Sequence, residues 1–146
     1  MNSIQLPIID YDFIKKLIPQ RKPIIMVDAI FEYEENRIVG GLSIKKESIF
    51  VQNNEFKEPG ILEHMAQTVA LYTGYQYYVN QMEAPTGYIG SMKAIEIFRL
   101  PKVGEKLRTK VDILHEIMGV TLVHIETKIE DEVIAKGEMK TVIAEK

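Results

Sequence analysis

The sequence predicts an α+β fold in which one long apolar helix is wrapped by a curved antiparallel sheet. Two observations predict this class. Apolar residues recur at helical spacing from Glu58 to about Asn80, and after Gly87 apolar and polar residues alternate along several strand-like segments. Because a hairpin precedes the helix and the other strands follow it as a group, without alternating with further helices, a parallel doubly wound sheet is excluded.

The first part of the chain predicts a short helix and a hairpin. Asp10 can cap a helix over residues 11–18, whose apolar side chains fall on one stripe. Two β-branched runs, residues 24–33 and 38–45, are expected to pair as antiparallel strands. Residues 46–57 are polar and are expected to be irregular.

The central helix is expected over residues 58–80, where Pro59 suits a first helical turn. Ala66, Ala70 and Gly74 follow one another at intervals of four, so one stripe of this helix is nearly bare and can lie close against another backbone. Antiparallel strands complete the fold, and they are expected at residues 88–100, 106–117, 120–130 and 133–143.

The composition is that of one compact domain, expected over residues 1–146. With 18 basic and 21 acidic side chains the formal net charge is −3, which gives no general attraction to nucleic acid or to an anionic membrane. The absence of cysteine excludes disulfides and thiolate catalysis. Neither a signal-like start nor a membrane-spanning apolar run is present, so a cytoplasmic location is expected.

Glu63 is the principal candidate for chemistry. It lies in the first turns of the expected central helix, and Gln67 follows one turn later on the same face. The helix N-terminus offers backbone N–H groups that can polarise a thioester carbonyl, and Gly60 would let a substrate approach there. An acid at this place can protonate a leaving hydroxyl, or as the carboxylate activate water. Acidic residues also occur near helix starts simply because they complement the helix dipole.

Neither a metal nor a nucleotide cofactor is expected. His64 points about a quarter-turn away from the candidate acid, and His115 and His124 lack a neighbouring carboxylate, which makes them a weak metal signal. No glycine-rich phosphate loop follows a strand, since Gly40 and Gly41 fit a bulge or a close backbone contact better.

Positive charge is concentrated in two stretches of an otherwise acidic chain. Such clusters either receive an acidic carrier protein or face solvent. The two stretches contain Lys15, Lys16, Arg21 and Lys22, and Arg99, Lys102, Lys106 and Arg108.

Three stretches resemble the 3-hydroxyacyl-acyl-carrier-protein dehydratase family. Residues 18–28, Ile-Pro-Gln-Arg-Lys-Pro-Ile-Ile-Met-Val-Asp, are similar to the family's Leu-Pro-His-Arg-x-Pro opening that ends in Val-Asp. Residues 61–67, Ile-Leu-Glu-His-Met-Ala-Gln, are similar to its Leu-Glu-x-Met-Ala-Gln on the central helix. Gly90 and Ser91, followed by residues 98–105, resemble its Gly-Ile and then Phe-Arg-x-Pro-Val-x-Pro-Gly-Asp. The three motifs occur in the family's order.

This resemblance implies a hot-dog fold, a dimer whose sheets join edge to edge, and an acyl tunnel at the dimer interface. It implies dehydration of a 3-hydroxyacyl thioester, carried by acyl carrier protein or coenzyme A, without a cofactor. Glu63 falls on the family's catalytic acid. Substrate contacts are expected from Gly60, Gln67, Gly90 and Ser91.

The chain departs from the family just before the central helix. The dehydratases pair their acid with a histidine base from the other subunit, carried in a Gly-His-Phe-Pro segment. Residues 51–60 read Val-Gln-Asn-Asn-Glu-Phe-Lys-Glu-Pro-Gly, without histidine. Asn53 or Asn54 occupies the approximate place, but an amide cannot take up a proton at neutral pH. The alternatives for the base are His64, a rearranged loop, or a histidine-bearing homologue in a heterodimer.

The sequence also resembles a divergent branch of dehydratase-like proteins that is encoded with aryl-polyene and flexirubin-type pigment pathways. Residues 65–70, Met-Ala-Gln-Thr-Val-Ala, are closer to that branch than to the housekeeping enzymes. A dehydratase of fatty-acid or polyene-type lipid biosynthesis is therefore favoured over a non-catalytic acyl-binding subunit and over a hot-dog thioesterase. An aromatic or polyene acyl chain, or ordinary dimer packing, would explain Tyr72, Tyr75, Tyr77 and Tyr78.

Overall fold

The computed structural model describes residues 6–144, which fold into two helices and eight strands. The single domain expected over residues 1–146 therefore extends beyond the described residues at both ends. The helices are α1 (Tyr11–Leu17) and α2 (Glu58–Val79). The strands are β1 (Ala29–Glu34), β2 (Arg37–Ser43), β3 (Val51–Gln52), β4 (Glu55–Phe56), β5 (Gly87–Ile97), β6 (Lys106–Ile117), β7 (Val120–Ile129) and β8 (Glu132–Ile143).

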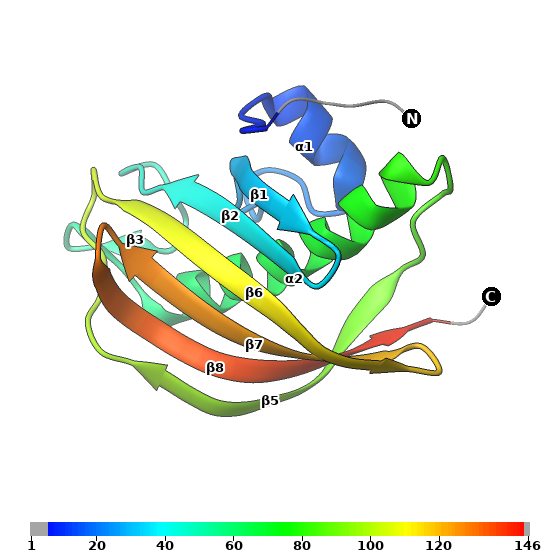
Figure 1. Ribbon diagram of the computed structural model, residues 1–146. Coiled ribbons are helices and arrows are strands. Elements are labelled where there is room, and N and C mark those ends of the chain that lie inside the picture. Colours follow the sequence, from blue (N-terminus) through cyan, green and yellow to red (C-terminus); the bar gives the residue numbers. More distant parts are fainter. Residues whose placement is uncertain (1–5, 145–146) are drawn as a thin grey trace.

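Six of these strands form one antiparallel sheet in the order β1-β2-β6-β7-β8-β5, and β3 and β4 form a separate small hairpin. Figure 1 shows the large sheet curving around α2, with α1 lying over the C-terminal half of that helix. The α+β class and the wrapped central helix are thus confirmed. No helix within residues 6–144 is long and apolar enough to cross a membrane.

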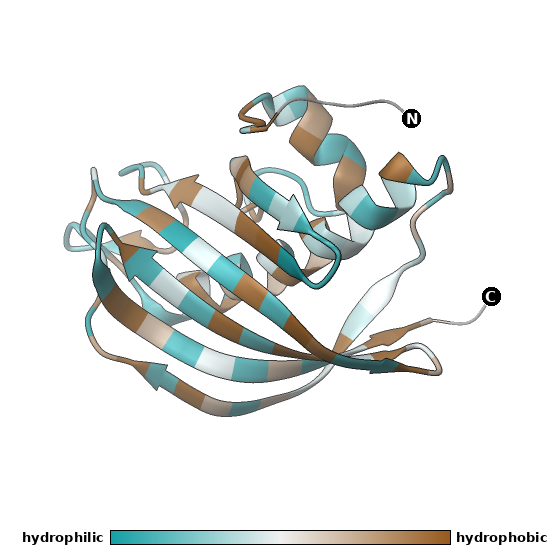
Figure 2. Ribbon diagram, viewed as in Figure 1, coloured by the Kyte–Doolittle hydropathy of each residue, from teal (hydrophilic) through white to brown (hydrophobic). Residues whose placement is uncertain are grey.

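The alternation of buried and half-buried side chains along the strands explains how the sheet covers the helix. Along β7, buried residues alternate regularly with half-buried ones, as expected for a strand with one face on the core. Figure 2 shows the same banding on neighbouring strands. The largest fully buried side chains are Phe56, Ile14, Ile30, Ile38, Ile61, Met65, Leu71, Leu107, Ile125, Ile134, Met139 and His64. Each large apolar side chain among them contributes about 1.5–3 kcal/mol by leaving water.

Glycine allows two close approaches around α2. A Cβ at Gly74 would overlap the backbone carbonyl of Leu17, so α1 ends directly against the helix at this point. A Cβ at Gly40 would lie 2.9 Å from Cγ2 of Thr68, so β2 also packs tightly on α2. The close contact expected at Gly40 is confirmed, and the bare stripe meets another backbone at Gly74, whereas Ala66 and Ala70 line a groove.

The N-terminal elements differ from the expectation in two places. The first strand begins at Ala29, because residues 22–24 form a turn, and Ile24 and Met26 hydrogen-bond to side chains of α2. Residues 46–57 are not wholly irregular, because Asn53 and Asn54 form a tight turn between β3 and β4. Both have positive φ, +54° and +65°, a conformation that asparagine tolerates better than most residues.

The edge strand β5 is the least covered part of the sheet. It pairs with β8 on one side, and no other strand within residues 6–144 pairs with its second side. Most of its residues are exposed, including the apolar side chains of Tyr88, Ile89 and Met92. The pairing with β8 shifts between Ile89 and Ser91, so Gly90 sits in a bulge. An exposed, apolar strand edge of this kind is suited to pairing with a second chain.

Candidate active site

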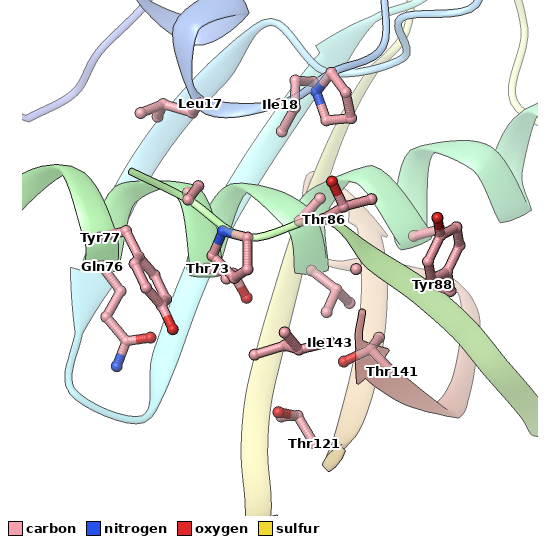
Figure 3. Close-up of a pocket in the computed structure, with 18 of the residues that line it drawn as sticks. Leu17, Ile18, Thr73, Gln76, Tyr77, Thr86, Tyr88, Thr121, Thr141 and Ile143 are labelled. Atoms are coloured by element: carbon pink, nitrogen blue, oxygen red, sulfur yellow. The ribbon is translucent and has the colours of Figure 1, made fainter. Parts of the chain in front are cut away.

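An elongated groove of about 440 Å³ runs along α2. Its walls are α2 itself, residues 16–20 at the end of α1 and just after it, residues 83–89 up to and including the start of β5, and parts of β6, β7 and β8. Figure 3 shows the α1 side of the groove and the opposite sheet side around α2, with the labelled residues Leu17, Ile18, Thr86, Thr121, Thr141 and Ile143. The small side chains of Ala66 and Ala70 on α2 leave this space open.

Glu63 and Tyr77 lie toward opposite ends of the groove. Both line it from α2, and the helix rise between them is about 20 Å. The lining is mixed, because apolar side chains such as Leu17 and Ile143 alternate with hydroxyls such as Thr121 and Thr141. A groove of this length and character can hold an extended chain that begins near a carboxyl group.

Gln67 holds Glu63 in place. Nε2 of Gln67 donates to Oε2 of Glu63 at 2.7 Å and to the carbonyl of Ile24 at 3.0 Å. Oε1 of Gln67 accepts from the backbone N–H of Met26 at 2.6 Å. Because Gln67 is buried and its amide bridges to backbone, the carboxylate cannot turn freely. The bond to Gln67 is made through Oε2, and Oε1 of Glu63 has no hydrogen-bond partner among residues 6–144.

His64 does not line the groove and is fully buried. Its Nδ1–H donates to the carbonyl of Met26 at 2.7 Å, and Nε2 accepts from the hydroxyl of Thr109 at 2.7 Å. Thr109 in turn is 2.7 Å from the hydroxyl of Thr127. Burial lowers the pKa of His64 to about 4, although the bond to Met26 opposes this shift. The ring is therefore neutral, and both nitrogens are occupied.

Asn54 and Gly60 also lie away from the groove lining. Asn54 is exposed in the β3–β4 turn, where its carbonyl accepts from the N–H of Val103 at 3.2 Å. Gly60 is buried, and a Cβ there would be 2.6 Å from the ring of Phe56 and 2.7 Å from Cβ of Phe50. The protein's own side chains fill the space where a substrate was expected, and the N–H of Gly60 donates to Lys57 at 2.9 Å.

Gly90 and Ser91 lie on the exposed part of β5, next to Ile89 at the edge of the groove. The bulge at Gly90 removes its backbone from the regular ladder with β8. Of the site residues expected from the sequence, the structure brings Glu63 and Gln67 together and places Gly90 and Ser91 next to the groove edge. It places His64, Asn54 and Gly60 away from the groove lining.

Gln20 is a groove residue that sequence reasoning missed. It lines the same cavity as Glu63, and its Oε1 is buried without a hydrogen-bond partner. The available signal was its position in the first motif, where the resembled family has histidine. Of the four tyrosines on α2, Tyr77 lines the groove, whereas Tyr72 and Tyr75 pack on Tyr33 with ring centroids 5.6 Å and 4.6 Å apart.

The two basic stretches have different surroundings. Arg99 is engaged by the carboxylates of Glu105 and Glu132, at 2.8 Å and 3.0 Å, and these hydrogen bonds raise its pKa. In the first stretch, Lys16 lines the groove and Lys22 lies 4.8 Å from the ring centroid of Tyr11. The first stretch therefore places positive charge beside the groove. Within residues 6–144 no group of three histidine, aspartate or glutamate side chains could hold a metal ion.

Fold and site together define a class of protein: a hot-dog domain with a fixed carboxyl group at one end of a groove along its central helix. The sequence profile of the ApeP-like family, described as ApeP dehydratase, matches residues 13–146. The chain belongs to this ApeP-like dehydratase family.

Similar proteins agree with this assignment. The chain is 31% identical over 142 residues to the 3-hydroxyacyl-acyl-carrier-protein dehydratase FabZ of Caldanaerobacter subterraneus subsp. tengcongensis, which covers 90% of this chain and 96% of that protein. It is 27% identical over 147 residues to FabZ of Anaeromyxobacter sp. strain K, covering 96% and 94% of the two chains. Among solved structures, a chain of the dehydratase heterocomplex ApeI:P from Xenorhabdus doucetiae superposes with a TM-score of 0.86 at 15% identity, covering 98% of this chain and 94% of that one.

Proposed function

We propose that this chain supplies the acid of a dehydratase site that acts on 3-hydroxyacyl thioesters in fatty-acid or polyene-type lipid biosynthesis. The observation that carries the proposal is the position of Glu63, which lines the groove and is fixed through Oε2 by the buried Gln67. The 3-hydroxyacyl thioester named for the FabZ relatives fits such a groove, because its acyl chain can extend along α2.

In the proposed reaction Glu63 is protonated and a separate base is neutral. The base removes a proton from C2 of the substrate, and the electron pair of the broken C2–H bond forms the C2–C3 double bond. The C3–O bond breaks, and the departing hydroxyl takes the proton of Glu63 and leaves as water. The products are a 2-enoyl thioester and water, and a proton passes from the base back to Glu63 before the next cycle.

We infer that a second, histidine-bearing subunit provides this base. His64 is poorly suited, because it is buried and both ring nitrogens are hydrogen-bonded. Asn54 is an amide in an exposed turn. The open edge of β5 offers a surface where another hot-dog subunit can pair and bring its histidine to the groove. The heterocomplex named for the similar Xenorhabdus structure supports this arrangement.

We infer that acyl carrier protein delivers the substrate. Lys16 at the groove and the nearby Lys15 and Lys22 present positive charge to an acidic partner. Comparing the rates with carrier-bound and coenzyme A-bound forms of one substrate tests this inference. Equal rates that do not depend on ionic strength would argue against carrier docking at these lysines.

The reaction is tested by mass spectrometry of 3-hydroxyacyl carrier protein after incubation with the purified chain, alone and with a histidine-bearing homologue. Glu63→Gln serves as the matched variant. Loss of water with the unaltered chain and the homologue, but not with the variant, is the expected result. Release of free acid without an enoyl product would select a thioesterase, and unchanged substrate in every mixture would select a binding subunit.

A further inference from the structure

Gln20 lines the same groove as Glu63, from the segment that follows α1. After α1 the chain runs along α2 toward the N-terminal end of that helix. The carbonyl of Leu17 packs against Gly74, and the carbonyl of Ile24 accepts a hydrogen bond from Gln67. Gln20 lies between these two anchors in the sequence.

The backbone around Gln20 is fixed by its neighbour. Nη1 of Arg21 donates to the carbonyl of Ile18 and to the carbonyl of Gln20, each at 2.8 Å. The N–H of Ile24 donates to the carbonyl of Arg21 at 2.9 Å, which closes the following turn. These hydrogen bonds hold the backbone on both sides of Gln20, whose side chain lines the groove.

The amide oxygen of Gln20 lacks a hydrogen-bond donor. Among the buried side-chain nitrogen and oxygen atoms of residues 6–144, Oε1 of Gln20 is the one without a hydrogen-bond partner. Buried acceptors are nearly always paired, and an exception in a groove calls for a donor from a bound molecule. By contrast, the buried amide of Gln67 makes hydrogen bonds through both its oxygen and its nitrogen.

We propose that Gln20 accepts a hydrogen bond from the 3-hydroxyl group of the bound substrate and so orients that group for Glu63. This inference rests on the proposed function. A hydroxyl carries one hydrogen and two acceptor lone pairs. For protonated Glu63 to donate to the hydroxyl oxygen, the hydroxyl hydrogen must point to a different acceptor. The unpaired Oε1 of Gln20 is such an acceptor on the groove wall.

The test measures how strongly the site prefers a hydroxylated ligand. The full chain carries Glu63→Gln, so that ligands are not turned over and the residue-63 amide can still donate. Two pantetheine ligands with the same acyl chain are titrated by calorimetry, one with the 3-hydroxyl and one without it. The hydroxylated ligand is expected to bind about threefold to tenfold more tightly, as one hydrogen bond allows.

Gln20→Met, added to this protein, is expected to abolish the preference while leaving the affinity for the deoxy ligand within about twofold. Gln76→Met is the matched control, because Gln76 lines the same groove further along α2, and it should leave the preference unchanged. A preference that survives Gln20→Met, an equal loss of affinity for both ligands, or no preference before the substitution would each overturn the proposal. Because binding is measured without turnover, failure of the dehydration assay alone would leave this result standing.

Discussion

At the scale of single residues, Glu63 depends on contacts that come from outside its own helix. Gln67, one turn away, is held by the carbonyl of Ile24 and the N–H of Met26. The segment before β1 therefore fixes the amide, and the amide fixes the carboxylate. A carboxyl group positioned in this way gives up little orientational freedom when the substrate binds.

Gln67→Met is expected to lower the dehydration rate by about 10²-fold with little change in KM, because Glu63 loses its anchor and a small displacement is costly. It should also lower the free energy of unfolding by about 1–3 kcal/mol, since the buried N–H of Met26 loses its acceptor. Steady-state kinetics and urea unfolding measure the two effects. With Gln76→Met as the control, an equal loss of rate in both variants would contradict the positioning role.

His64 predicts how stability depends on pH. Burial lowers its pKa from 6.5 to about 4 in the folded chain, so the unfolded chain binds a proton at higher pH than the folded chain does. The contribution of this pKa shift to the free energy of unfolding is fully present above pH 6.5 and is lost as the pH falls toward 4. From the linkage relation, the loss is roughly 3 kcal/mol.

Chemical unfolding of the unaltered chain and of His64→Gln, followed between pH 7 and pH 4, measures this effect. The stability difference between the two is expected to shrink by roughly 3 kcal/mol over that range, because glutamine does not titrate. Gln76→Met is the control at a residue that does not titrate, and it should keep the pH dependence of the unaltered chain. If the unfolding free energy depends on pH in the same way in the unaltered chain and in His64→Gln, the titration of His64 does not cause this dependence.

At the scale of elements, regular periodicity and the close approaches at Gly40 and Gly74 could be predicted from sequence, but the segments that make these contacts could not. The helical repeat predicts α2 to within one residue of its observed end at Val79, and the alternation predicts β6 over the observed residues. The two-residue strands β3 and β4 are too short to show a period. The same reasoning applies to the site, where the Glu63–Gln67 pair follows from helical spacing, whereas Gln20 enters the groove from a loop.

Gly74 carries the contact between α1 and α2, and Gly74→Ala tests it. In an unconstrained helix, alanine would stabilise by about 0.5–1 kcal/mol. Here the added Cβ overlaps the carbonyl of Leu17, so a net destabilisation of about 1–3 kcal/mol is expected. Gly87→Ala is the matched control, because its nearest atom would be 3.8 Å away. If the midpoint of thermal unfolding shifts by the same amount in both variants, α1 does not pack closely at Gly74.

At the scale of the whole molecule, β5 is where a second chain is expected to pair. Met92 lies on this strand and is 43% exposed, whereas Met118, at the β6–β7 turn, is 96% exposed. Met92→Glu is expected to shift the protein to monomers in sedimentation experiments, because a charge on the edge opposes strand pairing. Met118→Glu should leave the assembly unchanged despite its greater exposure. An intact oligomer with Met92→Glu would exclude this edge as the interface.

In the proposed active site, the acid of this chain acts together with a base from another subunit. The most direct measurement is dehydration of 3-hydroxyacyl carrier protein by mixtures in which one subunit type at a time carries a variant. Glu63→Gln in this chain should abolish activity with an unaltered histidine-bearing partner, and removal of the partner's histidine should do the same. Loss of the partner's own corresponding acid should leave most of the activity. Full activity with Glu63→Gln would contradict the account.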